Sequence, residues 1–136
     1  MDKLVKYLLL PLCIYVLSIT KSVAYHTALD ISGSWKHSEK PAWIQINFTN
    51  NVGEAVVFDH KNNIKANGLT VINQITANSD NNAEHNFHWS AKMYSMANDN
   101  FVDVKLTLAT DDTLIVFALN EHNAWYEVLK LHRQLP

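Results

Sequence analysis

The sequence predicts an all-β fold: a small antiparallel up-and-down barrel of about eight strands, preceded by an N-terminal signal peptide. Three observations predict it. Short segments alternate apolar and polar residues with a period of two, which is typical of strands that bury one face. Turns rich in Asn and Asp separate these segments after brief intervals. No segment carries the apolar stripe of an amphipathic helix.

Each predicted strand has its own apolar face. The first is short and contains Gly33, Ser34 and Trp35, and the others cover residues 42–48, 54–58, 69–75, 87–94, 102–108, 113–119 and 124–132. Segment 102–108 has the clearest alternation, with Val102, Val104, Leu106 and Leu108 on one face. Segment 87–94 is expected to place Phe87, Trp89, Ala91 and Met93 together on one face.

The connections favour a barrel over a sandwich. Successive short strands with brief turns form a meander, and closing it removes both exposed edges. The alternative is a two-sheet sandwich with Greek-key crossings, which needs longer crossover loops than this chain offers.

The first 24 residues have the layout of a secretory signal peptide. Lys3 and Lys6 precede an apolar run at 7–17, and Ser22-Val23-Ala24 supplies small residues for cleavage after Ala24. The apolar run is shorter than the roughly 20 residues that a membrane-spanning helix needs. A lipid-modified Cys13 is a further alternative, which the large Leu12 before it disfavours. We therefore expect a periplasmic or secreted protein without a membrane span after processing.

Residues 25–136 then form a single domain of a length that one core can stabilise. This part contains no cysteine, so it has no internal disulfide. It keeps eight Lys and Arg against twelve Asp and Glu, a formal charge of −4, and Arg133 is its one arginine. Without a basic cluster to neutralise phosphates, nucleic acid is not an expected partner.

Two features resemble the calycin superfamily of lipocalin-like barrels. Gly33-Ser34-Trp35 resembles the Gly-x-Trp motif that opens the first strand of these barrels, and Arg133 follows the last predicted strand. The resemblance implies that Trp35 and Arg133 form a structural pair that closes one end of the barrel. Such a cation–π contact contributes roughly 0.5 to 2 kcal/mol.

Most of the chain after the signal peptide also resembles an uncharacterised bacterial exported family, domain of unknown function 2147. The similar segments, in order, are 33–35, 43–46, 53–57, Asp59 with Asn62, 68–72, Trp89 with Tyr94, 105–108, 114–116 and Trp125. The chain departs from the family pattern at Ala91, at Ser95-Met96 and at Asp99. The resemblance implies a periplasmic barrel and brings no established activity.

No catalytic motif is present, so we expect neither an enzyme nor a cofactor. The serines lie in no nucleophile pattern, and three glycines cannot build a phosphate-binding loop. The candidates for binding a small apolar or amphipathic ligand are aromatic: Trp43, Phe58, Phe87, Trp89 and Trp125. An eight-stranded barrel is either filled by its side chains or holds one small molecule, and both possibilities stay open.

Two other functions remain as alternatives. The alternation places Trp43 opposite Ile44, on the solvent face or the rim, which is compatible with a protein-interaction module of the cell envelope. A copper or zinc site at His85, His88 and Met96 is a weaker alternative, because imidazole and thioether ligands suit copper. No metal site is expected, since the period of two separates His88 from Met93.

Overall fold

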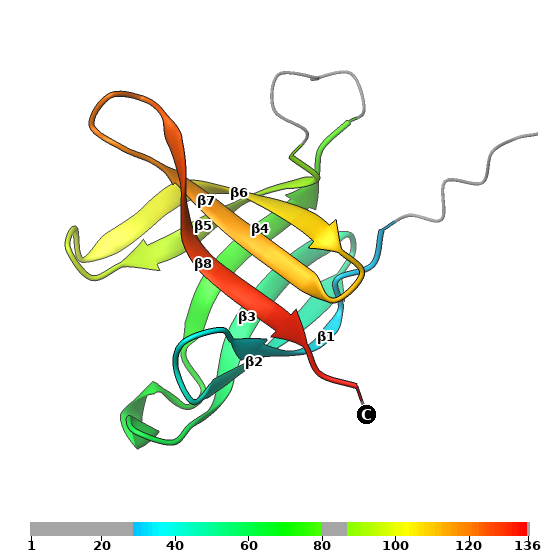
Figure 1. Ribbon diagram of the computed structural model, residues 1–136, viewed down its shortest axis with the longest axis vertical. Coiled ribbons are helices and arrows are strands. Elements are labelled where there is room, and N and C mark those ends of the chain that lie inside the picture. Colours follow the sequence, from blue (N-terminus) through cyan, green and yellow to red (C-terminus); the bar gives the residue numbers. More distant parts are fainter. Residues whose placement is uncertain (1–28, 80–86, 136) are drawn as a thin grey trace, which may run out of the picture.

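The computed structural model of the protein describes residues 29–79 and 87–135 and contains a closed antiparallel barrel (Figure 1). Its strands are β1 (Gly33–His37), β2 (Ala42–Thr49), β3 (Val52–His60), β4 (Thr70–Ala77), β5 (Trp89–Ser95), β6 (Asn100–Thr110), β7 (Thr113–Leu119) and β8 (Trp125–Arg133). The predicted all-β barrel is therefore confirmed. The predicted signal peptide and Cys13 lie outside the described residues.

The barrel closes between its first and last strands. Each strand pairs with its neighbours in chain order, and β1 pairs with both β2 and β8. At the closure Trp35 lies opposite Arg133, and His37 lies opposite Leu131. No edge strand is left over among the described strands, so their backbone groups are paired within the barrel.

The strand boundaries differ from the prediction mainly in length. Strand β7 matches its predicted range, whereas β6 extends over Asn100–Thr110 because the ladder continues into both flanking turns. A short 3-10 helix, η2 (Ile64–Ala66), lies in the connection between β3 and β4. Among the described residues, no helix has the length and hydropathy needed to cross a membrane.

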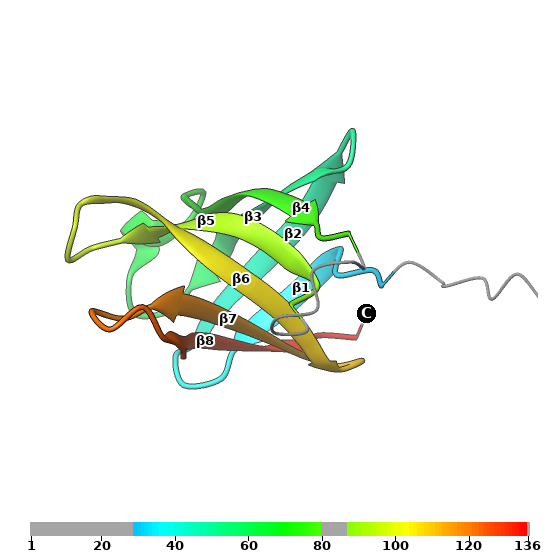
Figure 2. The ribbon, with the colours of Figure 1, turned by 90° about the horizontal axis from the view of Figure 1, so that it is seen from above.

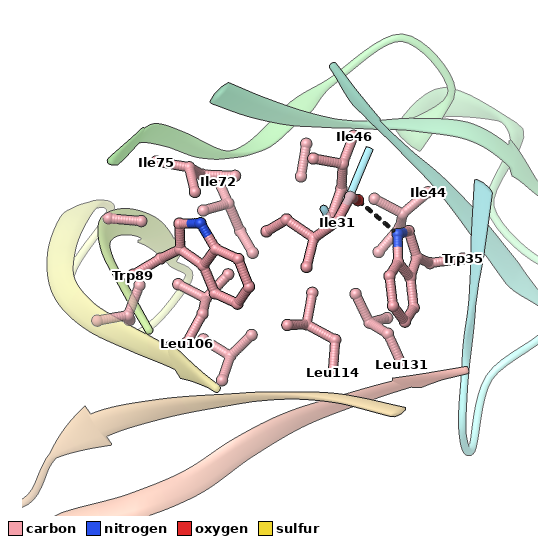
Figure 3. Packing of buried hydrophobic residues seen from close by; sticks show 14 of the residues in the cluster. Ile31, Trp35, Ile44, Ile46, Ile72, Ile75, Trp89, Leu106, Leu114 and Leu131 are labelled. Carbon is pink, nitrogen blue, oxygen red and sulfur yellow. Dashed lines mark hydrogen bonds between the residues drawn. The ribbon is translucent and has the colours of Figure 1, made fainter. Parts of the chain in front are cut away.

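The core lies inside the barrel and follows the period of two. Val104 and Leu106 of β6 are at most 1% exposed, and Leu108 is half-buried against them. Figure 3 shows side chains from several strands converging on one apolar cluster, with Trp35 and Trp89 in it. Burial of this cluster supplies the main stabilising term for a domain without disulfides.

The two ends of the barrel are built differently. Because successive strands run in opposite directions, the connections after β1, β3, β5 and β7 gather at one end, on the left in Figures 1 and 2. We call this the loop end. The segment 29–32, the turns after β2 and β6, and the end of β8 gather at the other, which we call the closed end.

Candidate functional site

The closed end is sealed by Trp35 and Arg133. The Arg133 Cζ atom lies 4.4 Å from the centroid of the fully buried Trp35 ring. The Trp35 Nε1–H donates a hydrogen bond of 2.9 Å to the Ile31 carbonyl, drawn as the dashed line in Figure 3. The Trp35 indole is therefore held by Arg133 against the face of its ring and by the Ile31 carbonyl at its N–H group.

The guanidinium of Arg133 also ties separate segments together. It donates to the carbonyls of Asp111 at 2.9 Å, Asp30 at 2.8 Å and Ser32 at 3.4 Å. The backbone N–H and the side chain of Ser32, followed by the charge of Arg133, hold the pKa of Asp30 below its usual value. All three guanidinium nitrogens of Arg133 therefore donate to backbone carbonyls, which gives this side chain a structural role at the closed end.

The five aromatic candidates lie in three separate places. Trp89 is 4% exposed and belongs to the core. Phe87 packs on Trp125 and on Phe117, with ring centroids 5.5 and 5.3 Å apart. Phe117 lies opposite Lys105, between the inward residues Val116 and Ala118 of β7, so this cluster is on the outer face.

The prediction that Phe87 shares the inward face of Trp89 is wrong. Strand β5 begins only at Trp89, and the backbone around His88 makes loop hydrogen bonds with Asn78 and Leu106. Alternation holds only within a ladder, so a residue before the strand is free to turn to the outer face.

Trp43 and Phe58 lie elsewhere on the outside. The half-buried Trp43 ring has the Nζ atoms of Lys36 and Lys61 each 5.6 Å from its centroid. Phe58 is 48% exposed and is the extra residue of a β-bulge, because Val57 pairs with Ile44 while Asp59 pairs with Trp43. The five aromatic candidates therefore share no common surface.

The metal candidates are not assembled in the described part of the chain. His85 lies outside the described residues. The His88 Nδ1 atom accepts a hydrogen bond of 3.0 Å from the Leu108 N–H, and Met96 is 88% exposed. Among residues 29–79 and 87–135, no group of three His, Cys, Asp or Glu could hold a metal ion.

The loop end has small or incompletely buried apolar residues facing inward. Ala42, Ala91 and Ala118 are 5 to 7% exposed, and none of them extends far toward the barrel axis. Met93 and Val102, which pair across β5 and β6, are only half-buried. The inner surface at this end is therefore apolar and incompletely covered.

Two further apolar residues border this inner surface. Ala66 of η2 packs against the core from the connection after β3. Tyr126 lies opposite Ala118 and is 48% exposed. We call Ala42, Ala66, Ala91, Met93, Val102, Ala118 and Tyr126 the inner loop-end residues.

Two histidines stand at the same end. His37 lies opposite Leu131, and His60 lies opposite Ala42, so the register gives both the inward face. The His37 Nδ1 atom accepts hydrogen bonds from the N–H groups of Glu39 and Lys40 at 3.0 and 3.2 Å. Burial, and next the positive charge of Lys40, lower the pKa of His37 from its usual 6.5.

His60 caps its own turn in the same way. Its Nδ1 atom accepts from the N–H groups of Asn62 and Asn63 at 3.2 and 3.0 Å. Sequence reasoning missed both histidines. The signal was present in part, because each histidine stands directly before a polar turn, where a side-chain acceptor can cap the next amides.

The geometry defines a class of protein, the small closed up-and-down β-barrel with one sealed end and one loop end. No protein-family model, no curated protein and no solved structure matches the chain. The fold class therefore rests on the structure itself, and membership of the family named above stays a prediction.

Proposed function

We propose that this protein is a non-enzymatic, exported, lipocalin-like β-barrel that binds one small apolar or amphipathic ligand at its loop end. The observation that carries the proposal is the uneven burial inside the barrel. Residues in the middle, such as Leu106 and its partner Val116, are fully buried, whereas Met93, Val102 and Tyr126 leave apolar surface exposed. Covering such apolar surface with a ligand favours binding by roughly 25 cal/mol for each Å² removed from water.

The residues at this end match what small-molecule sites usually contain. Such sites are lined mostly by apolar side chains, with a few polar groups that fix orientation. The inner loop-end residues supply the apolar part, and His37 and His60 supply the polar part. The five aromatic residues predicted from sequence are not the lining of this site, apart from Trp89, which lies in the core beneath it.

The proposal is tested with an environment-sensitive apolar dye and the protein's own tryptophan fluorescence. We expect a saturable signal with one site per chain. Met93→Lys should weaken dye binding at least tenfold, because it introduces a charge into the apolar surface. The matched control is Ala77→Lys on β4, whose side chain is exposed near the closed end, and it should bind like the unmodified protein.

A second variant separates loss of binding from loss of folding. Tyr126→Ser removes apolar area at the rim from a side chain that is already 48% exposed, so the fold should tolerate it. We expect weaker dye binding with an unchanged melting temperature. Absence of saturable binding by the unmodified protein, or equal binding by Met93→Lys, would overturn the proposal.

A protein-interaction module of the cell envelope is the second candidate function. The outer cluster of Phe87, Phe117 and Trp125 favours it, since aromatic residues are enriched at protein interfaces. Its test is capture of a defined partner from envelope extract by the unmodified protein and not by Trp125→Ser. A Trp125→Ser protein that captures the same partner would remove this candidate.

A further inference from the structure

His37 and His60 are both held with the same ring nitrogen occupied. Each Nδ1 atom accepts two backbone N–H groups, which only an unprotonated nitrogen can do. A neutral ring therefore carries its proton on Nε2, where it is a hydrogen-bond donor. Neither Nε2 atom donates to another residue within 29–79 and 87–135.

The two histidines end strands β1 and β3, directly before connections that adjoin each other. The Lys61 N–H donates a hydrogen bond of 3.0 Å to the Pro41 carbonyl, which joins the turn after β1 to the turn after β3. The ladder between β2 and β3 continues to Ala42 and His60 at the same place. His37 and His60 end the two strands that flank β2 at the same end of the barrel, so their two donors serve one region.

The surroundings of this pair are basic. Lys36 and Lys40 act on His37 together with one acidic neighbour, Glu39. Lys61, which follows His60, forms an ion pair of 2.6 Å with Asp59, so these two charges cancel and one net positive charge remains. The opposite connections of the loop end, after β5 and β7, instead carry acidic residues. The field across this end is thus positive on the histidine side.

We propose that His37 and His60 donate their Nε2–H groups to the head group of the ligand, and that the ligand is a carboxylate with an apolar tail. The carboxylate accepts both donors within the basic surroundings, because it has up to four acceptor positions. The tail lies on the inner loop-end residues, starting from Ala42 beside the pair. This inference rests on the proposed function and adds the chemical class of the ligand.

Three compounds with the same dodecyl chain test the inference by calorimetry near pH 7.5: the carboxylate, the primary alcohol and the trimethylammonium salt. All three offer the same apolar tail, so the proposed function alone predicts similar affinities. The inference predicts that the carboxylate binds about tenfold more tightly than the alcohol, and the ammonium most weakly.

The matched variants are His37→Asn and His60→Asn. An Asn side chain keeps an oxygen acceptor for the turn amides, as in an Asx-turn, but does not place a donor at the Nε2 position. We expect each variant to reduce the carboxylate's advantage over the alcohol, and the double variant to abolish it. His122→Asn, on the connection after β7, is the control and should keep the full advantage.

The outcomes separate the two proposals. Equal binding of the carboxylate and the alcohol, or a full carboxylate advantage in the double variant, would overturn the head-group inference and leave the proposed function standing. Absence of binding by all three compounds would overturn both. Melting curves of each variant show that loss of the advantage does not reflect loss of the fold.

Discussion

Arg133→Met should cost the protein about 3 kcal/mol of unfolding free energy. Methionine retains much of the side-chain length and removes the charge and all five donors. The lost contacts are the cation–π contact at 4.4 Å and three hydrogen bonds to carbonyls. We assign about 1 kcal/mol to the first and about 2 kcal/mol to the three bonds together, discounted for their exposure to solvent.

Urea unfolding followed by tryptophan fluorescence measures this loss. A change of this size lowers the melting temperature of a domain of this length by roughly 10 °C. Lys130→Met is the control on the same strand, because its ion pair with Glu127 is exposed and 3.5 Å long. We expect it to cost less than about 0.5 kcal/mol. If Arg133→Met costs no more than the control, the closed end is not held in the way described.

Three further predictions concern other parts of the barrel. Gly53→Ala should lower the free energy of unfolding by about 1 to 3 kcal/mol in urea, because the new Cβ would lie 2.8 Å from the Phe48 ring. Adding Phe48→Leu to this variant should restore part of the loss. Since the pKa of His37 is lowered in the folded state, stability should be full above pH 6.5 and fall below it, and His37→Asn should flatten that fall in melting curves. Asn73→Val should raise stability by about 1 kcal/mol, because the buried Asn73 Oδ1 has no hydrogen-bond partner; a loss in urea unfolding would contradict this.

The period of two was sufficient to predict the strands and their buried residues. It did not predict which aromatic side chains lie on the outer face. Val104 and Leu106 are buried as predicted because each residue within a ladder must face one side or the other. Phe87 was placed on the wrong face because it precedes its strand. Phe58 is exposed because it is the extra residue of a β-bulge. Bulges and strand ends depend on the partner strand's register, which a single segment's pattern does not contain.

The polar part of the candidate site was harder to predict than the apolar part. A period of two in the apolar residues predicts which face of a strand is buried, so the sequence placed Met93 and Val102 on the inner face. His37 and His60 are 23 positions apart in the chain, and only the pairing of β1, β2 and β3 brings them to one end. Because β2 lies between the strands that carry His37 and His60, the two residues have no characteristic spacing in the sequence by which the pair could be recognised.

The separation of the two ends has a consequence for how this barrel combines stability with recognition. At the closed end, the Trp35 indole N–H and all three guanidinium nitrogens of Arg133 donate to backbone carbonyls of the chain itself. At the loop end, the histidine donors and part of the apolar surface have no partner in the described chain. Sites that share no contacts contribute additively to free energy. A barrel that is stabilised by its core and its closed end can therefore leave recognition groups unsatisfied at the other end without unfolding.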